Sequence, residues 1–251
     1  MSNGIKVKKR NGRGVEPLDL EKIHVMVEEA CKGVAGVSAS QVEIQSGIQL
    51  YDGITTAEIQ EILIKSASDL IDLENPNYQF VAARLLLFSV RKSLYGRCRD
   101  IPSLEDHIIK CVGQEVYDAE IYDKYSKEDI EKANGYIDHD RDFMFTYAGL
   151  RQVVDKYLVQ DRSTGQVYET PQFMYMMIAL TIFANYPKEK RLNYVRRYYN
   201  AISKHKLNIP TPIMVGVRTP IRQFASCVLV DIDDTLDSIF SSDMALSLIH
   251  I

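Results

Sequence analysis

The sequence has 251 residues, 46% of them hydrophobic, and its 30 basic and 34 acidic side chains give a formal net charge of −4. A chain of this length and composition forms one large or two modest domains around a real core. The small acidic excess argues against a general nucleic-acid binder, which carries a basic excess. It does not exclude a local basic pocket for a nucleotide.

The N-terminal residues lack the apolar run that follows the charges of a secretory signal. No window approaches about 18 consecutive apolar residues, so we expect no membrane span. The four cysteines are scattered and form no CxxC pair: Cys31, Cys98, Cys111 and Cys227. This usage is typical of a reducing compartment, so we expect a cytoplasmic protein.

The first 96 residues predict a β-hairpin followed by four helices. Apolar and lysine side chains alternate over residues 5–8, Asn11-Gly12 is a tight-turn signal, and residues 15–18 would form the return strand. The four helices have these start signals: Asp19, Ser40, the capping-box pair Thr55 and Glu58, and Asn75-Pro76. Gly96 is a typical helix stop.

The second part is also predicted to be mostly helical. Three helix starts are expected, at Ser103 with Asp106, at Ser126 with Asp129 and at Thr170-Pro171. Two further helices are expected over residues 147–159 and, basic and rich in tyrosine, over residues 188–206. Residues 208–222 contain three prolines and should not form a regular helix. Residues 226–230 form a short, mainly apolar run with two β-branched valines and predict a buried strand, and Asp233-Asp234 would cap a final helix.

The usual local signatures are absent. There is no GxxxxGK[ST] phosphate loop, no GxGxxG, no HExxH and no GxSxG nucleophile elbow. Three weaker groups of residues therefore carry the functional argument.

The first group is basic. Lys8, Lys9, Arg10 and Lys22 lie around the hairpin and the start of the next helix, and Lys92 lies near the end of the fourth helix. A helix N-terminus favours phosphate, so these cations could hold a nucleotide. The alternative is a solvated hairpin with ordinary surface lysines.

The second group is the acidic run at residues 137–142, which contains His139. It could hold a divalent cation, but its spacing matches no established ligand pattern. The alternative, which we favour, is a turn stabilised by aspartate side chains. We assign no metal to this chain and no catalytic role to His139.

The third group is Thr211-Pro212 and Ser226-Cys227, which frame an irregular loop before the predicted strand. A cysteine at such a place is chemically active or simply buried, because free cysteine is among the most buried residue types.

The run VKKRNG, then YDGITTAEIQ, then NPNYQFVAARLLLFSVRKSLYG, resembles the ATP-cone, a regulatory nucleotide module at the N-terminus of many ribonucleotide reductases. The resemblance implies that six residues contact ATP or dATP: Lys9, Glu16, Asp19, Lys22, Thr56 and Lys92. Some members carry histidines where this chain has Gln60 and Ser89. This departure puts inhibition by dATP in doubt more than nucleotide binding itself.

The segment LNIPTPIMVGVRTPIRQFASCVL resembles the start of the ten-stranded barrel of the large subunit of class I ribonucleotide reductase, and YIDHDRDFMFTYAGLRQVVDKYL resembles its helical domain. The resemblance implies that Cys227 is one of two redox cysteines and that Thr211 and Ser226 help to hold the substrate. It places the site of the specificity effector at Asp234, Thr235 and Leu236.

The resemblance implies a mainly α (α+β) fold. Residues 1–96 would form the ATP-cone, a β-hairpin plus four helices. Residues 97–222 would form the helical N-terminal domain, and residues 223–251 the start of an incomplete α/β barrel.

The implied function is a component of ribonucleoside-diphosphate reductase, an oxidoreductase that makes deoxyribonucleotides for DNA synthesis by radical chemistry with a redox cysteine pair. The implied effectors are ATP, dATP and other deoxynucleoside triphosphates. The implied partners are a small (beta) subunit that carries the radical metallocofactor, thioredoxin or glutaredoxin, and further copies in an oligomer. No nucleic-acid or membrane partner is expected.

No second redox cysteine is apparent, and the family's large subunit is several times longer. We therefore expect the isolated chain to be inactive and to need a polypeptide with the rest of the barrel. A truncated fragment and a naturally split subunit are both open. The alternative function is a free-standing ATP/dATP-sensing regulatory module, but a sensor has no use for the PTP…SCVL segment, which favours the enzyme component.

Overall fold

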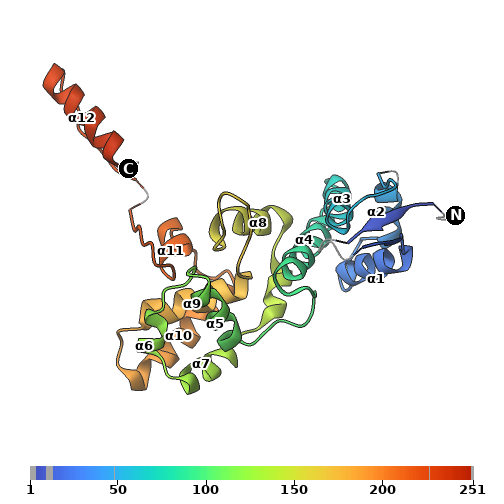
Figure 1. The fold of residues 1–251 in the computed structure, drawn as a ribbon, viewed down its shortest axis with the longest axis horizontal. Coiled ribbons are helices and arrows are strands. Elements are labelled where there is room, and N and C mark those ends of the chain that lie inside the picture. Colours follow the sequence, from blue (N-terminus) through green and yellow to red (C-terminus); the bar gives the residue numbers. More distant parts are fainter. Residues whose placement is uncertain (1–3, 10–13, 48, 226, 250–251) are drawn as a thin grey trace.

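The computed structural model describes residues 4–9, 14–47, 49–225 and 227–249. Most of the chain is helical, and the helices run from the small N-terminal hairpin at one end of the molecule to a separate helix, α12, at the other (Figure 1). No helix in these described ranges is long and apolar enough to cross a membrane.

The predicted hairpin is confirmed. Strands β1 (Lys6–Lys8) and β2 (Val15–Pro17) pair antiparallel, with Val7 opposite Glu16. Val7 is 3% exposed, since alternate side chains of a strand face opposite sides. The Asn11-Gly12 turn lies outside the described residues.

Four helices follow the hairpin, as predicted: α1 (Leu20–Cys31), α2 (Ala39–Gly47), α3 (Thr56–Asp69) and α4 (Tyr78–Tyr95). The Thr55 and Glu58 side chains form the expected capping box at the start of α3. Gly96 ends α4 in the left-handed conformation, φ 73°, and its N–H donates to the Lys92 carbonyl.

The predicted start of α4 is wrong by two residues. Asn75 does not cap the helix. Its N–H and its side chain donate to the Asp72 carboxylate, which closes a turn before the helix. Helix α4 begins at Tyr78, after Asn77, because this turn uses the hydrogen bonds that the cap would have supplied.

The second half packs eight short or medium helical elements: α5 (Leu104–Gly113), α6 (Glu120–Lys124), α7 (Lys127–Asn134), the 3₁₀ helix η1 (His139–Met144), α8 (Tyr147–Gln152), the π-helix η2 (Val153–Tyr157), α9 (Pro171–Phe183) and α10 (Lys188–Ser203). Ser103 and Ser126 cap α5 and α7 as predicted. The helix predicted over residues 147–159 is instead two elements, because the hydrogen-bond pattern widens after Gln152.

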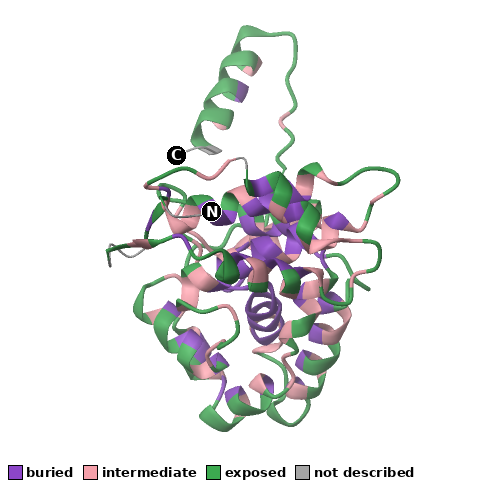
Figure 2. Cartoon of the chain, turned by 90° about the vertical axis from the view of Figure 1, so that its right-hand side faces the viewer, coloured by how far each residue is buried: buried purple, intermediate pink, exposed green. Residues whose placement is uncertain are grey.

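Helix α9 forms the centre of this half. Its first ten residues, from Pro171 to Leu180, are all buried. A helix that is apolar all round belongs inside a core, and the sequence PQFMYMMIAL has no polar face. Buried residues gather in the middle of the body, whereas α12 is almost entirely exposed (Figure 2).

Helix α4 is common to both halves. It packs against α1 and α3 on one side and against α8 and η1 on the other. Phe88 of α4 meets Phe143 of η1 edge to face at 6.3 Å between ring centroids, and the Arg84 guanidinium lies 5.2 Å from the same Phe143 ring. The predicted domain boundary at residue 96 therefore comes directly after a helix that also packs against elements of the second half.

Residues 208–222 depart from the prediction that they contain no regular helix. A short helix, α11 (Thr211–Gly216), follows Pro210. Pro212 lies in its first turn, where a backbone N–H has no partner within the helix and its absence costs little.

The buried strand predicted over residues 226–230 is also wrong for the part that the structure describes. Residues 227–230 form no strand, and Leu229 is 97% exposed. A strand needs a neighbour for its backbone hydrogen bonds, and the two strands of the hairpin are the only sheet in the described ranges.

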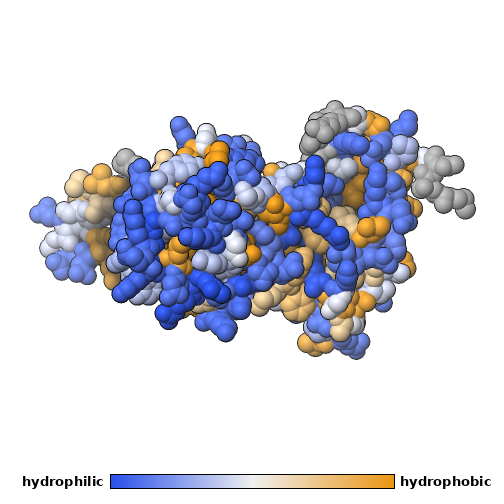
Figure 3. All heavy atoms as spheres, turned by 90° about the horizontal axis from the view of Figure 1, so that it is seen from below, coloured by the Kyte–Doolittle hydropathy of each residue, from blue (hydrophilic) through white to orange (hydrophobic). Residues whose placement is uncertain are grey.

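Helix α12 (Leu236–Ile249) begins one residue later than predicted from Asp233-Asp234. Its first turn is capped by Thr235, whose Oγ1 accepts the Ser238 N–H at 3.2 Å. Hydrophobic residues are visible at the end of the molecule where α12 lies (Figure 3), and Leu236, Phe240 and Met244 are each more than half exposed.

Candidate functional site

A cavity of about 370 Å³ opens beside the hairpin, between the N-termini of α1 and α3 and the last turn of α4. All six residues that the sequence assigned to a nucleotide line it: Lys9, Glu16, Asp19, Lys22, Thr56 and Lys92. The structure thus brings together residues that lie up to 83 positions apart in the chain. That a nucleotide binds there stays a prediction.

The cavity carries more positive than negative charge, from three lysines and two carboxylates. Lys9 Nζ lies 2.8 Å from Glu16 Oε2, and Lys22 Nζ lies 3.7 Å from Glu16 Oε1 and 3.4 Å from Asp19 Oδ2. The hydrogen bond from Lys9, reinforced by the charges of both lysines, lowers the pKa of Glu16. The carboxylate of Glu16 therefore forms ion pairs with two of the lysines that an anionic ligand would contact.

Two helix N-termini border the cavity. Helix α1 starts immediately after Asp19, whose side chain accepts the Glu21 N–H, and Thr56 is the first residue of α3. The first N–H groups of a helix and its dipole favour negative charge. The local sequence positions both ends, because Asp19 and Thr55 are strong N-cap residues.

The other side of the cavity is apolar. It is formed by Val7, Leu18, Ile23, Met26 and Ile59. These side chains were not predicted to belong to a site. An apolar wall beside cations suits a purine base with attached phosphates.

Gln60 also lines the cavity, and it is 2% exposed. Its Nε2 donates to the Leu85 carbonyl of α4 at 3.0 Å, so the amide links α3 to α4 beneath the cavity. Ser89, the other position where the chain departs from the ATP-cone pattern, is half-buried and is not among the lining residues.

The residues assigned to substrate and to the specificity effector are less enclosed. Thr211 is half-buried at the start of α11, and Cys227 is exposed. Ser226 lies outside the described residues. The three effector-site residues, Asp234, Thr235 and Leu236, are exposed at the start of α12.

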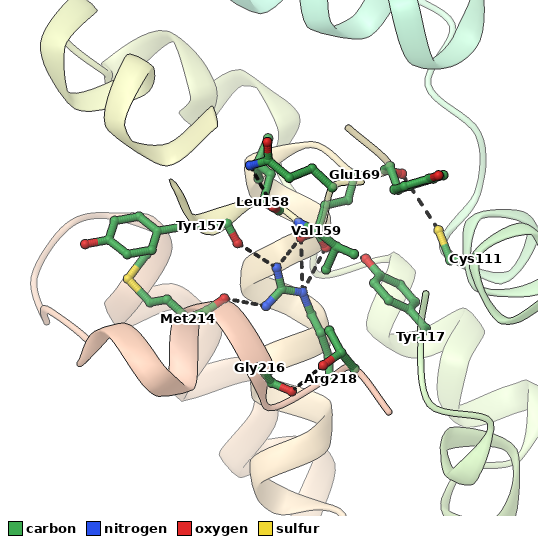
Figure 4. Close-up of polar contacts among 12 residues, drawn as sticks. Cys111, Tyr117, Tyr157, Leu158, Val159, Glu169, Met214, Gly216 and Arg218 are labelled. Atoms are coloured by element: carbon green, nitrogen blue, oxygen red, sulfur yellow. Dashed lines mark hydrogen bonds and ion pairs between the residues drawn. The ribbon is translucent and has the colours of Figure 1, made fainter. Parts of the chain in front are cut away.

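Helix α11, which carries Thr211, is held by a buried charge pair (Figure 4). The Arg218 guanidinium pairs with the Glu169 carboxylate, and both side chains are 0% exposed. Arg218 also donates to the Met214 carbonyl at 2.5 Å and to the Tyr157 carbonyl at 3.0 Å. Sequence reasoning missed Arg218 and Glu169, because the two residues are 49 positions apart and neither belongs to a local motif.

The acidic run at residues 137–142 forms a turn rather than an open cluster. Asp138 caps η1 by accepting the Asp140 N–H at 3.2 Å. The Asp142 carboxylate is buried, and it accepts from Arg91 at 3.0 Å. Burial lowers the pKa of His139 to about 4, so its imidazole is neutral at pH 7.

Comparison with known proteins finds two domain families that match separate parts of the chain. Residues 5–93 match the ATP cone domain, and residues 143–222 match the all-alpha domain of ribonucleotide reductase. The first match covers the hairpin and nearly all of α1–α4. The second covers the end of η1, the elements α8–α11 and the Glu169–Arg218 pair.

Similar proteins include the ribonucleoside-diphosphate reductase subunit alpha of Haemophilus influenzae and the ribonucleoside-diphosphate reductase 1 subunit alpha of Escherichia coli. Each is 48% identical over 246 residues, which is 98% of this chain and 32% of the relative. The subunit alpha of Enterobacteria phage T4 is 44% identical over 226 residues, 89% of this chain and 29% of the relative. The chain thus spans about a third of the length of the relatives it matches.

Proposed function

On the premise that the chain is similar over 98% of its length to about a third of ribonucleotide reductase alpha subunits and matches the ATP cone domain over residues 5–93, we propose that it is the effector-binding part of such a subunit. The cavity beside the hairpin would bind ATP or dATP. The observation that carries this proposal is the convergence of Lys9, Lys22 and Lys92 on one cavity that two helix N-termini border.

The geometry supports a nucleoside triphosphate in a defined orientation. The apolar wall would hold the base, and the three lysines with the Thr56 hydroxyl would hold the phosphates. A triphosphate has more charge than the Glu16 carboxylate, so it would replace Glu16 as the partner of Lys9 and Lys22. Nucleotide binding would therefore rearrange the ion pairs that Glu16 forms with Lys9 and Lys22.

For the complete enzyme we propose the reduction of ribonucleoside diphosphates. The ribose 2′-hydroxyl leaves as water, two cysteine thiols become a disulfide, and thioredoxin or glutaredoxin reduces that disulfide again. Cys227 would be one of the two cysteines, and Thr211 would contact the substrate. The radical that starts the reaction would come from the small subunit, and the remaining active-site residues would lie in the two thirds of the relatives that this sequence does not match.

Isothermal calorimetry of the 251-residue chain tests the nucleotide site. We expect one ATP or dATP per chain, and we expect Lys9→Ala and Lys92→Ala each to weaken binding by about 10-fold or more, the loss typical of one charge-assisted hydrogen bond. Lys65→Ala is the matched control, because Lys65 is exposed on α3 and does not line the cavity. Absence of binding heat, or variants equal to the wild type, would remove the proposal.

Reconstitution tests the redox role. The chain would be combined with a polypeptide that carries the remaining barrel and with the radical-generating subunit, and deoxynucleotide formation would be assayed. We expect Cys227→Ser to abolish turnover with a dithiol reductant, whereas Cys31→Ser should leave it unchanged. Normal turnover by Cys227→Ser would show that this thiol is not one of the redox pair.

A further inference from the structure

Helix α4 presents adjacent residues to two different environments. Lys92 lines the cavity, and Arg91, about 100° away around the helix, enters the core of the second half. Arg91 is 4% exposed, and its Nη2 donates to Asp142 Oδ2 at 3.0 Å and to the His139 carbonyl at 2.9 Å. The helix turn that would touch a bound phosphate is therefore tied directly to η1.

The contacts continue from η1 into the central helix. Asp142 Oδ1 accepts from Gln172 Nε2 at 2.8 Å, and Gln172 Oε1 accepts from the Tyr199 hydroxyl at 2.7 Å. Asp142, Gln172 and Tyr199 are each at most 1% exposed. Gln172 lies in the first turn of α9, so this turn is fixed by its polar side chain as well as by apolar packing.

The same end of α9 carries the second buried charge pair. Glu169 precedes Gln172 by three residues and binds Arg218, which in turn holds the Met214 carbonyl of α11 (Figure 4). Two buried ion pairs, Arg91–Asp142 and Glu169–Arg218, are thus linked through residues 169–172 at the N-terminus of α9, where Gln172 contacts Asp142. They connect the helix of the nucleotide cavity to the helix that begins with Thr211.

We propose that these contacts couple the cavity to α11, so that a nucleoside triphosphate held by Lys92 changes the stability of α11 and the position of Thr211. This inference rests on the proposed function for the identity of the ligand. It adds a series of contacts within one chain through which the proposed effector cavity would influence α11, the helix that carries the proposed substrate-binding residue Thr211.

The physical reason lies in burial. Charges removed from water depend on each other for stabilisation, so a small displacement of one partner is costly and the other partner follows it. Exposed pairs do not have this property. Arg97 and Asp100, just after α4, are 73% and 69% exposed, and water can replace either partner. The buried pairs are therefore the polar contacts through which movement of α4 would reach the second half, beside its apolar packing on η1 and α8.

Hydrogen–deuterium exchange on the full chain, with and without ATP, tests the coupling. We expect ATP to slow exchange at the cavity, residues 16–22, and also at residues 139–144 and 211–216. Asp142→Asn should keep the protection at the cavity and lose it at the two distant segments. Asp140→Asn is the matched control, because Asp140 is exposed in the same 3₁₀ helix and should behave as the wild type.

Coupling is reciprocal, so the same variant should change nucleotide affinity. We expect the Kd for ATP to rise by about 5-fold or more in Asp142→Asn, although Asp142 does not line the cavity, and to stay unchanged in Asp140→Asn. Protection by ATP that is confined to the cavity would overturn the coupling and leave the nucleotide site intact. No protection anywhere would overturn the nucleotide site itself. If Asp142→Asn does not fold, exchange in the wild-type chain still decides the matter.

Discussion

Arg218 and Glu169 form an ion pair from which water is excluded, since both side chains are 0% exposed. Both partners make further hydrogen bonds. The Arg218 guanidinium donates to the Met214 and Tyr157 carbonyls, and the Glu169 carboxylate accepts from the Tyr117 hydroxyl. This pair joins the segment before α9 to the residues just after α11. Arg222, four residues further on, adds ion pairs with Asp118 and Glu120 of the helical body.

Removing one charge of this pair should be strongly destabilising. We expect Glu169→Gln to lower the free energy of unfolding by about 3–5 kcal/mol, because it leaves the Arg218 charge buried without compensation. Urea unfolding at pH 7 measures the loss. Asp100→Asn is the control: it breaks the exposed pair with Arg97 and should cost less than about 1 kcal/mol. Similar losses in the two variants would contradict the burial argument.

A buried histidine should make the protein sensitive to acid. His107 is 1% exposed and stacks on Phe173 at 4.2 Å between centroids, and burial lowers its pKa to about 3. Below the ordinary value of 6.5 the unfolded chain binds a proton that the folded chain does not, so stability falls as the pH falls from about 6.5 towards 3. This group alone contributes up to about 1.4 kcal/mol per pH unit.

Replacing this ring isolates its contribution. His107→Phe should reduce the slope of unfolding free energy against pH between pH 6 and pH 4 by about 1 kcal/mol per unit, whatever it does to stability at pH 7. His139 acts in the same direction, and Asp142, whose pKa burial raises to about 6, acts in the opposite one, so only the difference between variant and wild type is informative. Parallel curves of unfolding free energy against pH for the variant and the wild type would show that the pKa of His107 does not differ between the folded and unfolded chain.

The Glu16 carboxylate should compete with a nucleotide. It contacts both Lys9 and Lys22, so we expect Glu16→Gln to tighten ATP binding by about 3- to 10-fold at low ionic strength, with a smaller gain at high salt. Calorimetry at 50 mM and 300 mM salt would measure both values. Weaker binding by this variant would mean that the carboxylate itself contacts the nucleotide, which is what the resemblance to the ATP-cone implies for Glu16.

The four cysteines should differ in accessibility. Cys227 is exposed, whereas Cys111 is 0% exposed and burial raises its pKa to about 12. Burial also raises the pKa of Cys31 to about 11. We expect an aromatic disulfide reagent to modify Cys227 fastest in the native chain, since the thiolate is the reactive form. A fast phase that survives Cys227→Ser would contradict this order.

Features that depend on a few neighbouring residues were well predicted from the sequence. The Thr55–Glu58 capping box, the Ser103 and Ser126 caps and the stop at Gly96 are all present. Each depends on hydrogen bonds within one helical turn, so the local sequence determines them. Asn75 failed for the same kind of reason, because the nearby Asp72 takes its hydrogen bonds.

Features that depend on distant residues were not predicted. Arg91 and Asp142 are 51 positions apart, and the sequence near each residue does not indicate that the two form an ion pair. The segment at residues 227–230 has the composition of a strand, but pairing needs a second strand that the hydrophobic pattern cannot supply. For the cavity, the resemblance and the cations near helix starts indicated the polar side, and the apolar wall became visible only in the fold.

Helix α4 has 18 residues and is about 27 Å long at 1.5 Å per residue. Its side chains belong to one hydrophobic core that both halves of the chain share, and they contact α1 and α3 of the first half and α8 and η1 of the second. A fragment that ends at residue 96 would contain the whole of α4. The side of the helix that carries Phe88 and Arg91 would then be exposed to water. We accordingly expect the 251-residue chain to unfold on heating in a single cooperative step, and we expect residues 1–96 alone to be less stable than the same residues within that chain.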